Sequence, residues 1–455
     1  MGIDSGIAPL SATWRDQMFL VLVFVLPVHT VFLSAWISWK PFLILLIAIV
    51  AGDVVDGIRL RRWPYHRSAT LALLPFLAVI VLGYPVAGLR ERYLRLSLAI
   101  LVGALLMLAT ELRLRSGVSS DRLFRTIFRS SAAMGLTGVV LAIVSVGGFG
   151  AGAIDAVNDI PGVFRVSKPA YLESGFLALT NWHQDPGYGA AWAVLWSMAA
   201  LVASLRGLGT RSRFLDGALI GAVWFTVVMA FSRTGWLSLP LAMMITTVGL
   251  RREGVPVGAV LRRAAAAALT AVLALGAVWA TDRPGVGGDL DLQFAFRVGQ
   301  GWDLLADLTG FFSTSDEFAD RFEPTEERAD VWPEYLAMFR SHPVLGVGLG
   351  VGWQTNSIRQ EPHNLVIELL AETGLAGMVA FLGLLGVVVH RGRGAVAGAL
   401  LLITFLPSIT QTVLFEPAWW FAAGLFLARP EPGGGAGRVP SGEARAGIRD
   451  RSRDG

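Results

Sequence analysis

In the apolar stretch EPHNLVIELLAETGLAG (361–377), a histidine directly precedes three polar residues that stand at helical spacing. His363 follows a proline, and Asn364, Glu368 and Glu372 then come at four-residue intervals. That interval places the three polar side chains on one face of a helix. Because imidazole can accept a proton near neutral pH, His363 is a candidate general base. The alternative is a residue at a helix start that bonds to nearby backbone.

Arginines supply the candidate anion-binding groups. Arg233 lies in FSRTGW, and Arg328 shares a predicted helix, TEERADVWPEYLAMFR, with Trp332 on the same face. A guanidinium stays charged and matches phosphate oxygens through two parallel hydrogen bonds. Arg233 also fits an arginine that extends to the membrane interface. Pro333 predicts either a modest kink in the helix or its true start.

Two further motifs carry turn residues. Asp185, in NWHQDPGYGAAW, precedes Pro-Gly and either opens a helix or contacts a substrate. HPVLGVGLGVGW (342–353) has four alternating glycines, but no strand–loop–helix pattern surrounds it, which argues against a nucleotide loop. We expect a glycine turn that lets the backbone approach a ligand or the membrane.

The sequence predicts neither a metal nor a cofactor. The chain has no cysteine, which excludes disulfides and thiolate ligands. The histidines expected near the site, His183, His342 and His363, show no H-x-x-x-H or H-E-x-x-H spacing. The acidic residues around them are not grouped.

The elements that carry these residues are those of a polytopic membrane protein. The 455 residues are 54% hydrophobic and only 16% charged. Membrane-spanning helices need roughly 17–25 apolar residues. We predict an all-α membrane domain over 1–428 with about twelve such helices, near 18–38, 41–57, 69–87, 93–111, 132–150, 186–205, 214–232, 235–250, 264–280, 366–389, 394–411 and 413–428.

The charges set the expected orientation. With both termini cytoplasmic, most of the 38 basic residues lie inside and most of the 34 acidic residues outside, as the positive-inside rule requires. This predicts a multi-pass protein of the cytoplasmic membrane whose basic residues meet lipid head groups, with no nucleic-acid partner. The first apolar run is predicted to be a retained helix, and 429–455 a disordered cytoplasmic tail.

Two long segments fall on the outer side, at 151–185 and 281–363. Loops of that length usually carry function. The larger one is expected to fold as short helices over an outer cavity that opens sideways to lipid. Within it, 290–312 mixes large apolar and charged residues, which predicts a helix along the membrane surface.

Four pieces in this order resemble the bacterial O-antigen ligase/O-antigen polymerase family: FSRTGW, the pair Arg328 and Trp332, HPVLGVGLG and HNLVIELLAETGLAG. The specific resemblance covers roughly 220–380; elsewhere it is one of helix number and topology. It implies a membrane-embedded glycosyltransferase of the GT-C type, working without a metal. Its donor would be a glycan on undecaprenyl diphosphate, and its acceptor a hydroxyl on a glycan, lipid or protein.

Carried over by position, the resemblance implies that Arg233 and Arg328 hold the diphosphate. His363 would act as general base or orient the acceptor, with Asn364 or Glu368 orienting its imidazole. The leaving diphosphate gains negative charge that fixed cations stabilise. Asp185 and Trp332 complete the expected substrate-binding set, and Arg233, Arg328 and His363 are expected to converge on one pocket.

Other functions remain open from the sequence. The external histidine-bearing loop is slightly more typical of a ligase, and a repeat-unit polymerase of the same family is the first alternative. A transporter or flippase of lipid-linked glycan fits about twelve helices. Against it, the halves show no repeat and the polar groups concentrate at outer helix ends. A purely structural membrane subunit would need no grouping of histidine and two arginines.

Overall fold

The structure is a computed structural model. It describes residues 14–28, 40–61, 63–65, 67–87, 91–146, 170–171, 177–178, 186–230, 232–281, 327–357, 361–362, 364–409 and 413–428. At a few positions at the ends of elements, among them Arg233 and Arg328, it describes the backbone alone. Asp185, His363 and the tail 429–455 lie outside the described residues.

The described chain is helical almost throughout. In chain order the helices are α1 (Trp14–Val25), α2 (Pro41–Arg59), α3 (Arg67–Ala87), α4 (Glu91–Ser116), α5 (Ser120–Val146), α7 (Pro186–Leu205), α8 (Arg213–Met229), α9 (Arg233–Arg252), α10 (Val257–Thr281), α12 (Glu327–Ser341), α13 (Val351–Thr355), α14 (Leu365–Arg391), α15 (Ala395–Phe405), η2 (Leu406–Ile409), η3 (Val413–Phe415) and α16 (Pro417–Leu427). A short antiparallel ladder pairs β1 (Ala170–Tyr171) with β2 (Leu177–Ala178). Apart from this two-residue ladder, the described elements are helices, which is consistent with the predicted all-α polytopic membrane protein.

Seven described helices are long and apolar enough to cross a membrane: α2, α3, α4, α5, α7, α10 and α14. Two shorter apolar helices, α15 and α16, follow them. Each of the twelve predicted runs contains a described helix, although α1 ends at Val25, well before the predicted end of its run. The number of membrane crossings stays a prediction.

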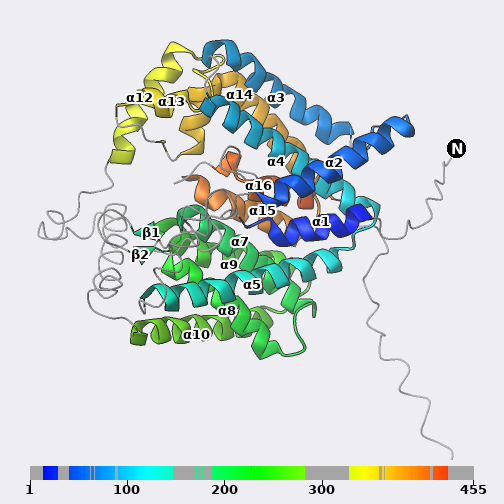
Figure 1. The fold of residues 1–455 in the computed structure, drawn as a ribbon, viewed down its shortest axis with the longest axis vertical. Helices are drawn as coiled ribbons and strands as arrows, with labels where there is room; N and C mark the ends of the chain where they lie inside the picture. Colours follow the sequence, from blue (N-terminus) through cyan, green and yellow to red (C-terminus); the bar gives the residue numbers. More distant parts are fainter. Residues whose placement is uncertain are drawn as a thin grey trace, which may run out of the picture.

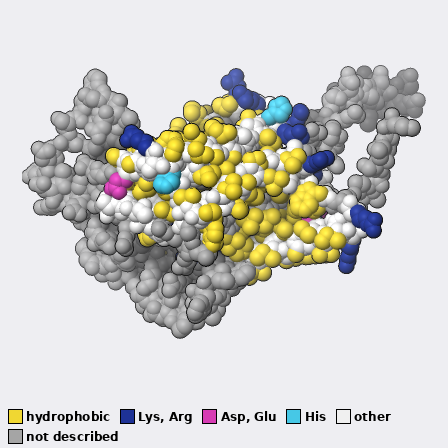
Figure 2. All heavy atoms as spheres, turned by 90° about the horizontal axis from the view of Figure 1, so that it is seen from above, with side chains coloured by type: hydrophobic (Ala, Val, Ile, Leu, Met, Phe, Trp, Pro, Cys, Tyr) yellow, Lys and Arg dark blue, Asp and Glu magenta, His cyan; other side chains and the backbone are white. Residues whose placement is uncertain are grey.

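Apolar side chains point outward as well as inward, as a lipid environment requires. On α10, Leu269, Val272 and Leu273 are more than half exposed. Figure 2 shows one face of the molecule on which hydrophobic side chains cover most of the described surface and basic side chains lie mainly toward one end. This surface fits a protein whose outer helices face lipid tails.

The bundle is tightly packed where small residues allow close approach. α16 lies among the other helices (Figure 1), and its Trp419 and Trp420 are almost completely buried. A Cβ on Gly103 of α4 would lie 2.2 Å from the Trp420 ring, and one on Gly424 would lie 2.5 Å from the Met107 carbonyl oxygen. Glycine is therefore required for α4 and α16 to pack at this distance.

The described parts of the two long segments 151–185 and 281–363 lie at one end of the bundle. Figure 1 shows α12, α13 and the β1–β2 ladder at the same end. The part of 281–363 that the structure describes does contain short helices, α12 and α13. The predicted surface helix at 290–312 lies outside the described residues.

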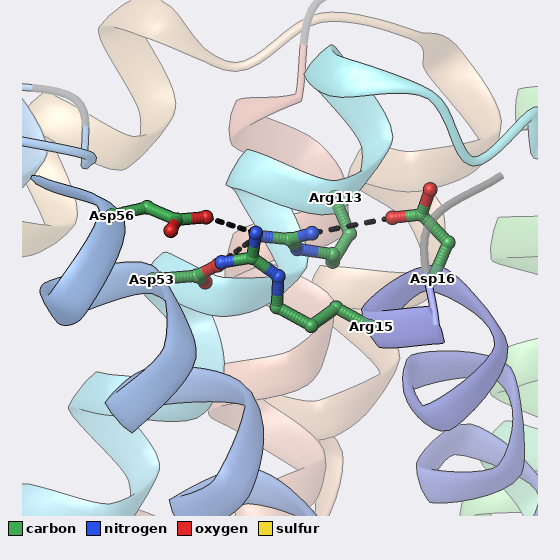
Figure 3. A network of polar contacts seen from close by, with 5 residues as sticks. All are labelled: Arg15, Asp16, Asp53, Asp56 and Arg113. Carbon is green, nitrogen blue, oxygen red and sulfur yellow. Dashed lines mark hydrogen bonds and ion pairs between the residues drawn. The ribbon is translucent and has the colours of Figure 1, made fainter. Parts of the chain in front are cut away.

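Buried charges join three helices at the predicted cytoplasmic side (Figure 3). Arg15 of α1 bonds Asp53 at 3.0 Å and also pairs with Asp56, both on α2. Arg113 of α4 pairs with Asp53 and contacts Asp16 at 3.3 Å. The side chains of Arg113 and Asp53 are almost fully buried. This cluster fixes the relative positions of α1, α2 and α4.

Replacing Arg113 with methionine is expected to destabilise the protein by about 3 kcal/mol, because it removes a buried cation that two carboxylates, Asp16 and Asp53, share. Asp53 is then paired with Arg15 alone. Thermal unfolding of the detergent-solubilised protein, followed by tryptophan fluorescence, measures this change. The control is Arg125→Met, since Arg125 is exposed on α5. Equal melting temperatures for the two variants would contradict the assigned role of the cluster.

Candidate active site

Helix α14 is broken in its N-terminal half, at Gly374. Gly374 has φ 66° and ψ −168°, a backbone conformation essentially restricted to glycine. A break at membrane depth leaves peptide groups that need other partners. Those partners lie in residues 343–350, which we call the glycine segment.

Four backbone hydrogen bonds join the glycine segment to the break. Val347 N and Gly348 N donate to the carbonyl oxygens of Ala371 and Glu372, both at 2.9 Å. In the other direction, the carbonyl oxygens of Pro343 and Val344 accept from the amides of Leu375 and Ala376, at 2.9 and 3.0 Å. The motifs HPVLGVGLG and ETGLAG are therefore two halves of one backbone junction.

The junction explains why both motifs contain glycine. Gly346 has a positive φ, and a Cβ there would lie 2.4 Å from the Glu372 carbonyl carbon. A Cβ on Gly374 would lie 2.3 Å from the Val344 carbonyl oxygen. The sequence suggested a turn that approaches a ligand or the membrane; the backbone that these glycines approach is that of α14.

The polar stripe of α14 is largely engaged within the protein. Asn364 is the N-cap, and its Oδ1 accepts from the amides of Val366 and Ile367 at 3.1 and 3.2 Å. Glu368 and Glu372 are buried. Glu372 Oε2 accepts from Gly350 N at 2.8 Å, which fastens the end of the glycine segment to α14.

Helix α12 packs along α14 and continues through Pro333 from Glu327, so the proline does not mark its start. Its Tyr335 is completely buried and forms an apolar cluster with Val331 and Ala371. Burial and the nearby glutamates, Glu372 first, raise the pKa of Tyr335 above its ordinary value. Its hydroxyl therefore stays protonated throughout the physiological range.

Trp332 connects α12 to the segment that carries the candidate histidine. Its Nε1 donates to the carbonyl oxygen of Pro362 at 2.9 Å. Pro362 directly precedes His363, and Trp332 lies one turn along α12 from Arg328. The structure thus brings α12, the helix of Arg328, into contact with Pro362, the residue before His363.

The other arginine motif begins a different helix. Arg233 is the first residue of α9, and the Ser232 hydroxyl caps the helix by accepting from Gly235 N at 3.3 Å. A Cβ on Gly235 would lie 2.6 Å from that of Ala190, so α9 packs closely on the first turns of α7. α7 begins at Pro186, directly after Asp185 in the sequence.

The structure therefore assembles the predicted residues in two groups. Trp332, on the same helix as Arg328, contacts Pro362 just before α14, and the motif of Arg233 adjoins the start of the helix that follows Asp185. The side chains of Arg233 and Arg328, like all of His363, lie outside the described part. Their convergence on one pocket stays a prediction.

Sequence reasoning missed one cation at this end. Arg92, the second residue of α4, pairs with Glu361, two residues before His363. The positive-inside rule could have pointed to Arg92. Basic residues are usually found at cytoplasmic helix ends, and Arg92 lies at an end that is predicted to be external.

The metal-free character of the site also stays a prediction. In the part of the chain that the structure describes, no three His, Asp or Glu side chains gather as metal ligands.

One known family model covers most of these features in a single match. Residues 217–382 match the family model described as O-antigen ligase. A search of curated proteins found no match. The matched region runs from α8 to the middle of α14 and includes the start of α9, all of α12, the glycine segment and the break at Gly374. Over residues 217–382, the chain is therefore similar to the O-antigen ligase family.

Proposed function

We propose that this protein is a glycosyltransferase that moves a glycan from undecaprenyl diphosphate to an acceptor hydroxyl on the outer face of the cytoplasmic membrane. The family assignment supports ligase-like or polymerase-like chemistry. The observation that carries the proposal is the bond from Trp332 to the Pro362 carbonyl, which joins the helix of Arg328 to the segment of His363. This contact supports a site in which the proposed phosphate-binding and proton-accepting groups lie at one end of the bundle.

In this mechanism Arg233 and Arg328 hold the diphosphate. Cleavage of the sugar–phosphate bond leaves negative charge on the departing undecaprenyl diphosphate, and a preorganised guanidinium stabilises it as it develops. Both residues begin or nearly begin a helix. The amide groups of a helix N-terminus add a favourable field for an anion.

His363 removes the proton of the acceptor hydroxyl as the oxygen attacks the anomeric carbon. Asn364 is committed through Oδ1 to capping α14, which leaves its amide nitrogen for substrate or imidazole. Glu368, buried one turn deeper, is the carboxylate suited to orient the ring. Trp332 and Asp185 line the approach of the donor.

The proposed orientation places this chemistry outside the cell membrane, with both termini in the cytoplasm and about twelve crossings. The break in α14 supports a site at this level, because irregular backbone in a membrane protein occurs where protein or water covers it. The acceptor is the terminus of another glycan, lipid or protein. A repeat-unit polymerase is the alternative within the same chemistry.

A deletion strain complemented with variants tests the function. The readouts are the surface glycan on a gel and the undecaprenyl-linked glycan in the membrane. A ligase predicts long polymer retained on its carrier with His363→Ala, Arg328→Ala or Arg233→Ala, whereas a polymerase predicts single repeat units. Arg340→Ala, exposed on the last turn of α12, should restore the wild-type pattern. Normal glycan with all three site variants would contradict the proposal and favour a transporter.

A further inference from the structure

The backbone of α4 around Arg92 is held in place by contacts with neighbouring helices. The next residue, Tyr93, donates its hydroxyl to the Ile80 carbonyl oxygen, which ties the start of α4 to α3. Further along, α4 is packed against α16 through Gly103 and Gly424. The base of the Arg92 side chain is therefore fixed by two neighbouring helices.

The Arg92 side chain spans the region between the glycine segment and the start of α14. A Cβ on Gly350 would lie 2.8 Å from Arg92 Cγ, so the aliphatic part of the side chain lies directly on that glycine. The guanidinium carbon lies 4.1 Å from the centroid of the Trp353 ring, and Nη2 pairs with Glu361. A planar guanidinium is suited to stack and to form an ion pair at once.

These contacts hold one end of a short stretch of chain. Glu361 is held by Arg92, and the next carbonyl, that of Pro362, is held by Trp332. Asn364 then caps α14. The residues on either side of His363 in the sequence, Pro362 and Asn364, are thus both held by contacts of the described chain.

We propose that Arg92 is a positioning residue for glycan transfer: through its contacts with Glu361 and Trp353 it holds the two residues, Glu361 and Pro362, that directly precede His363. The inference rests on the proposed function. Arg92 acts on the segment before α14 and not on the substrate. Its side chain is 25% exposed and that of Glu361 29%, and pairs of this exposure contribute little to overall stability. The consequence of losing the pair is a shift of the attached segment.

The first test is Arg92→Gln in purified, nanodisc-embedded protein. The probe is undecaprenyl-linked glycan extracted from the deletion strain, with that strain's envelope fraction as acceptor. We expect kcat to fall by about 10–100-fold while KM for the donor changes by less than about threefold, because misplacement by about 1 Å costs that much. The melting temperature should match that of Arg95→Gln, an exposed arginine of the same helix.

Glu361→Gln supplies an independent route to the same result. If the two residues act through their ion pair, each single variant lowers kcat similarly and Arg92→Gln/Glu361→Gln lowers it no further. The exchanged pair Arg92→Glu/Glu361→Arg should recover part of the rate. Arg92→Lys should recover little, because an ammonium does not reproduce the planar stack on Trp353.

Two results would overturn the inference. In the first, Arg92→Gln changes donor KM strongly while Glu361→Gln has no effect, which would mean that Arg92 binds the donor itself. In the second, both variants keep wild-type kcat while His363→Ala is inactive. Wild-type activity in His363→Ala and Arg328→Ala would instead contradict the proposed function, so the two failures are distinguishable.

Discussion

Replacing His363 with alanine is expected to lower kcat for glycan transfer by about 10²–10⁴-fold, the usual contribution of a positioned general base. The donor still binds, because the arginines that hold its diphosphate are intact. KM for the lipid-linked glycan should therefore change little. Initial rates of undecaprenyl diphosphate release from purified protein in nanodiscs measure both quantities.

The pH dependence separates a base from a group that only orients the acceptor. A base must be neutral, so the wild-type rate should fall as the solution becomes acidic and the imidazole takes a proton. The residual rate of His363→Ala should lack this acidic limb. His390→Ala, at the other end of α14, is the control and should keep the wild-type profile. A His363→Ala enzyme with the full wild-type rate and profile would remove His363 from the mechanism.

Gly374→Ala is expected to have the largest effect on the fold of the site. An alanine there would hold a strained backbone conformation, which costs on the order of 1–3 kcal/mol. Its Cβ would also meet the Val344 carbonyl oxygen at 2.3 Å and Gly346 N at 2.7 Å. To relieve that clash the glycine segment must separate from α14, which breaks the hydrogen bonds of the junction. We expect loss of transfer activity together with a lower melting temperature.

The same helix offers matched controls for Gly374. Gly383 and Gly386 are helical, and a Cβ at either position meets nothing within 4 Å. Gly383→Ala and Gly386→Ala should therefore keep activity and stability close to wild type, since alanine favours a helix over glycine by roughly 1 kcal/mol. Melting curves and transfer rates of the three variants measure whether the backbone conformation at Gly374 is required. If Gly374→Ala behaves like the two controls, the break in α14 is not required.

Helix positions were largely predictable from the sequence because they depend on local composition. Apolar runs of membrane length marked α2, α3, α4, α5, α7, α10 and α14, and each is found where its run predicts. Helix starts also have local signals, such as Ser232 before α9 and Asn364 before α14. The periodicity of the stripe predicts that Glu368 and Glu372 share one face of α14; both are buried, and Glu372 accepts a hydrogen bond from the glycine segment.

The junction could not be predicted, because it joins residues that lie far apart in the chain. Nothing local to Val347 or Gly348 shows that their hydrogen-bond partners are Ala371 and Glu372. The Arg92–Glu361 pair spans an even longer separation, from α4 to the start of α14. Glycine motifs report a need for close approach, but only the folded chain shows what is approached.

The most direct test of the central claim is whether this one protein cleaves the bond between glycan and undecaprenyl diphosphate and forms a new bond to a hydroxyl. Purified protein in nanodiscs would be given radiolabelled lipid-linked glycan and an acceptor fraction from the deletion strain. The account predicts equal amounts of transferred glycan and free undecaprenyl diphosphate with wild type, and neither product with His363→Ala or Arg328→Ala. Intact lipid-linked glycan in the wild-type reaction, together with its movement across the bilayer in proteoliposomes, would contradict the account.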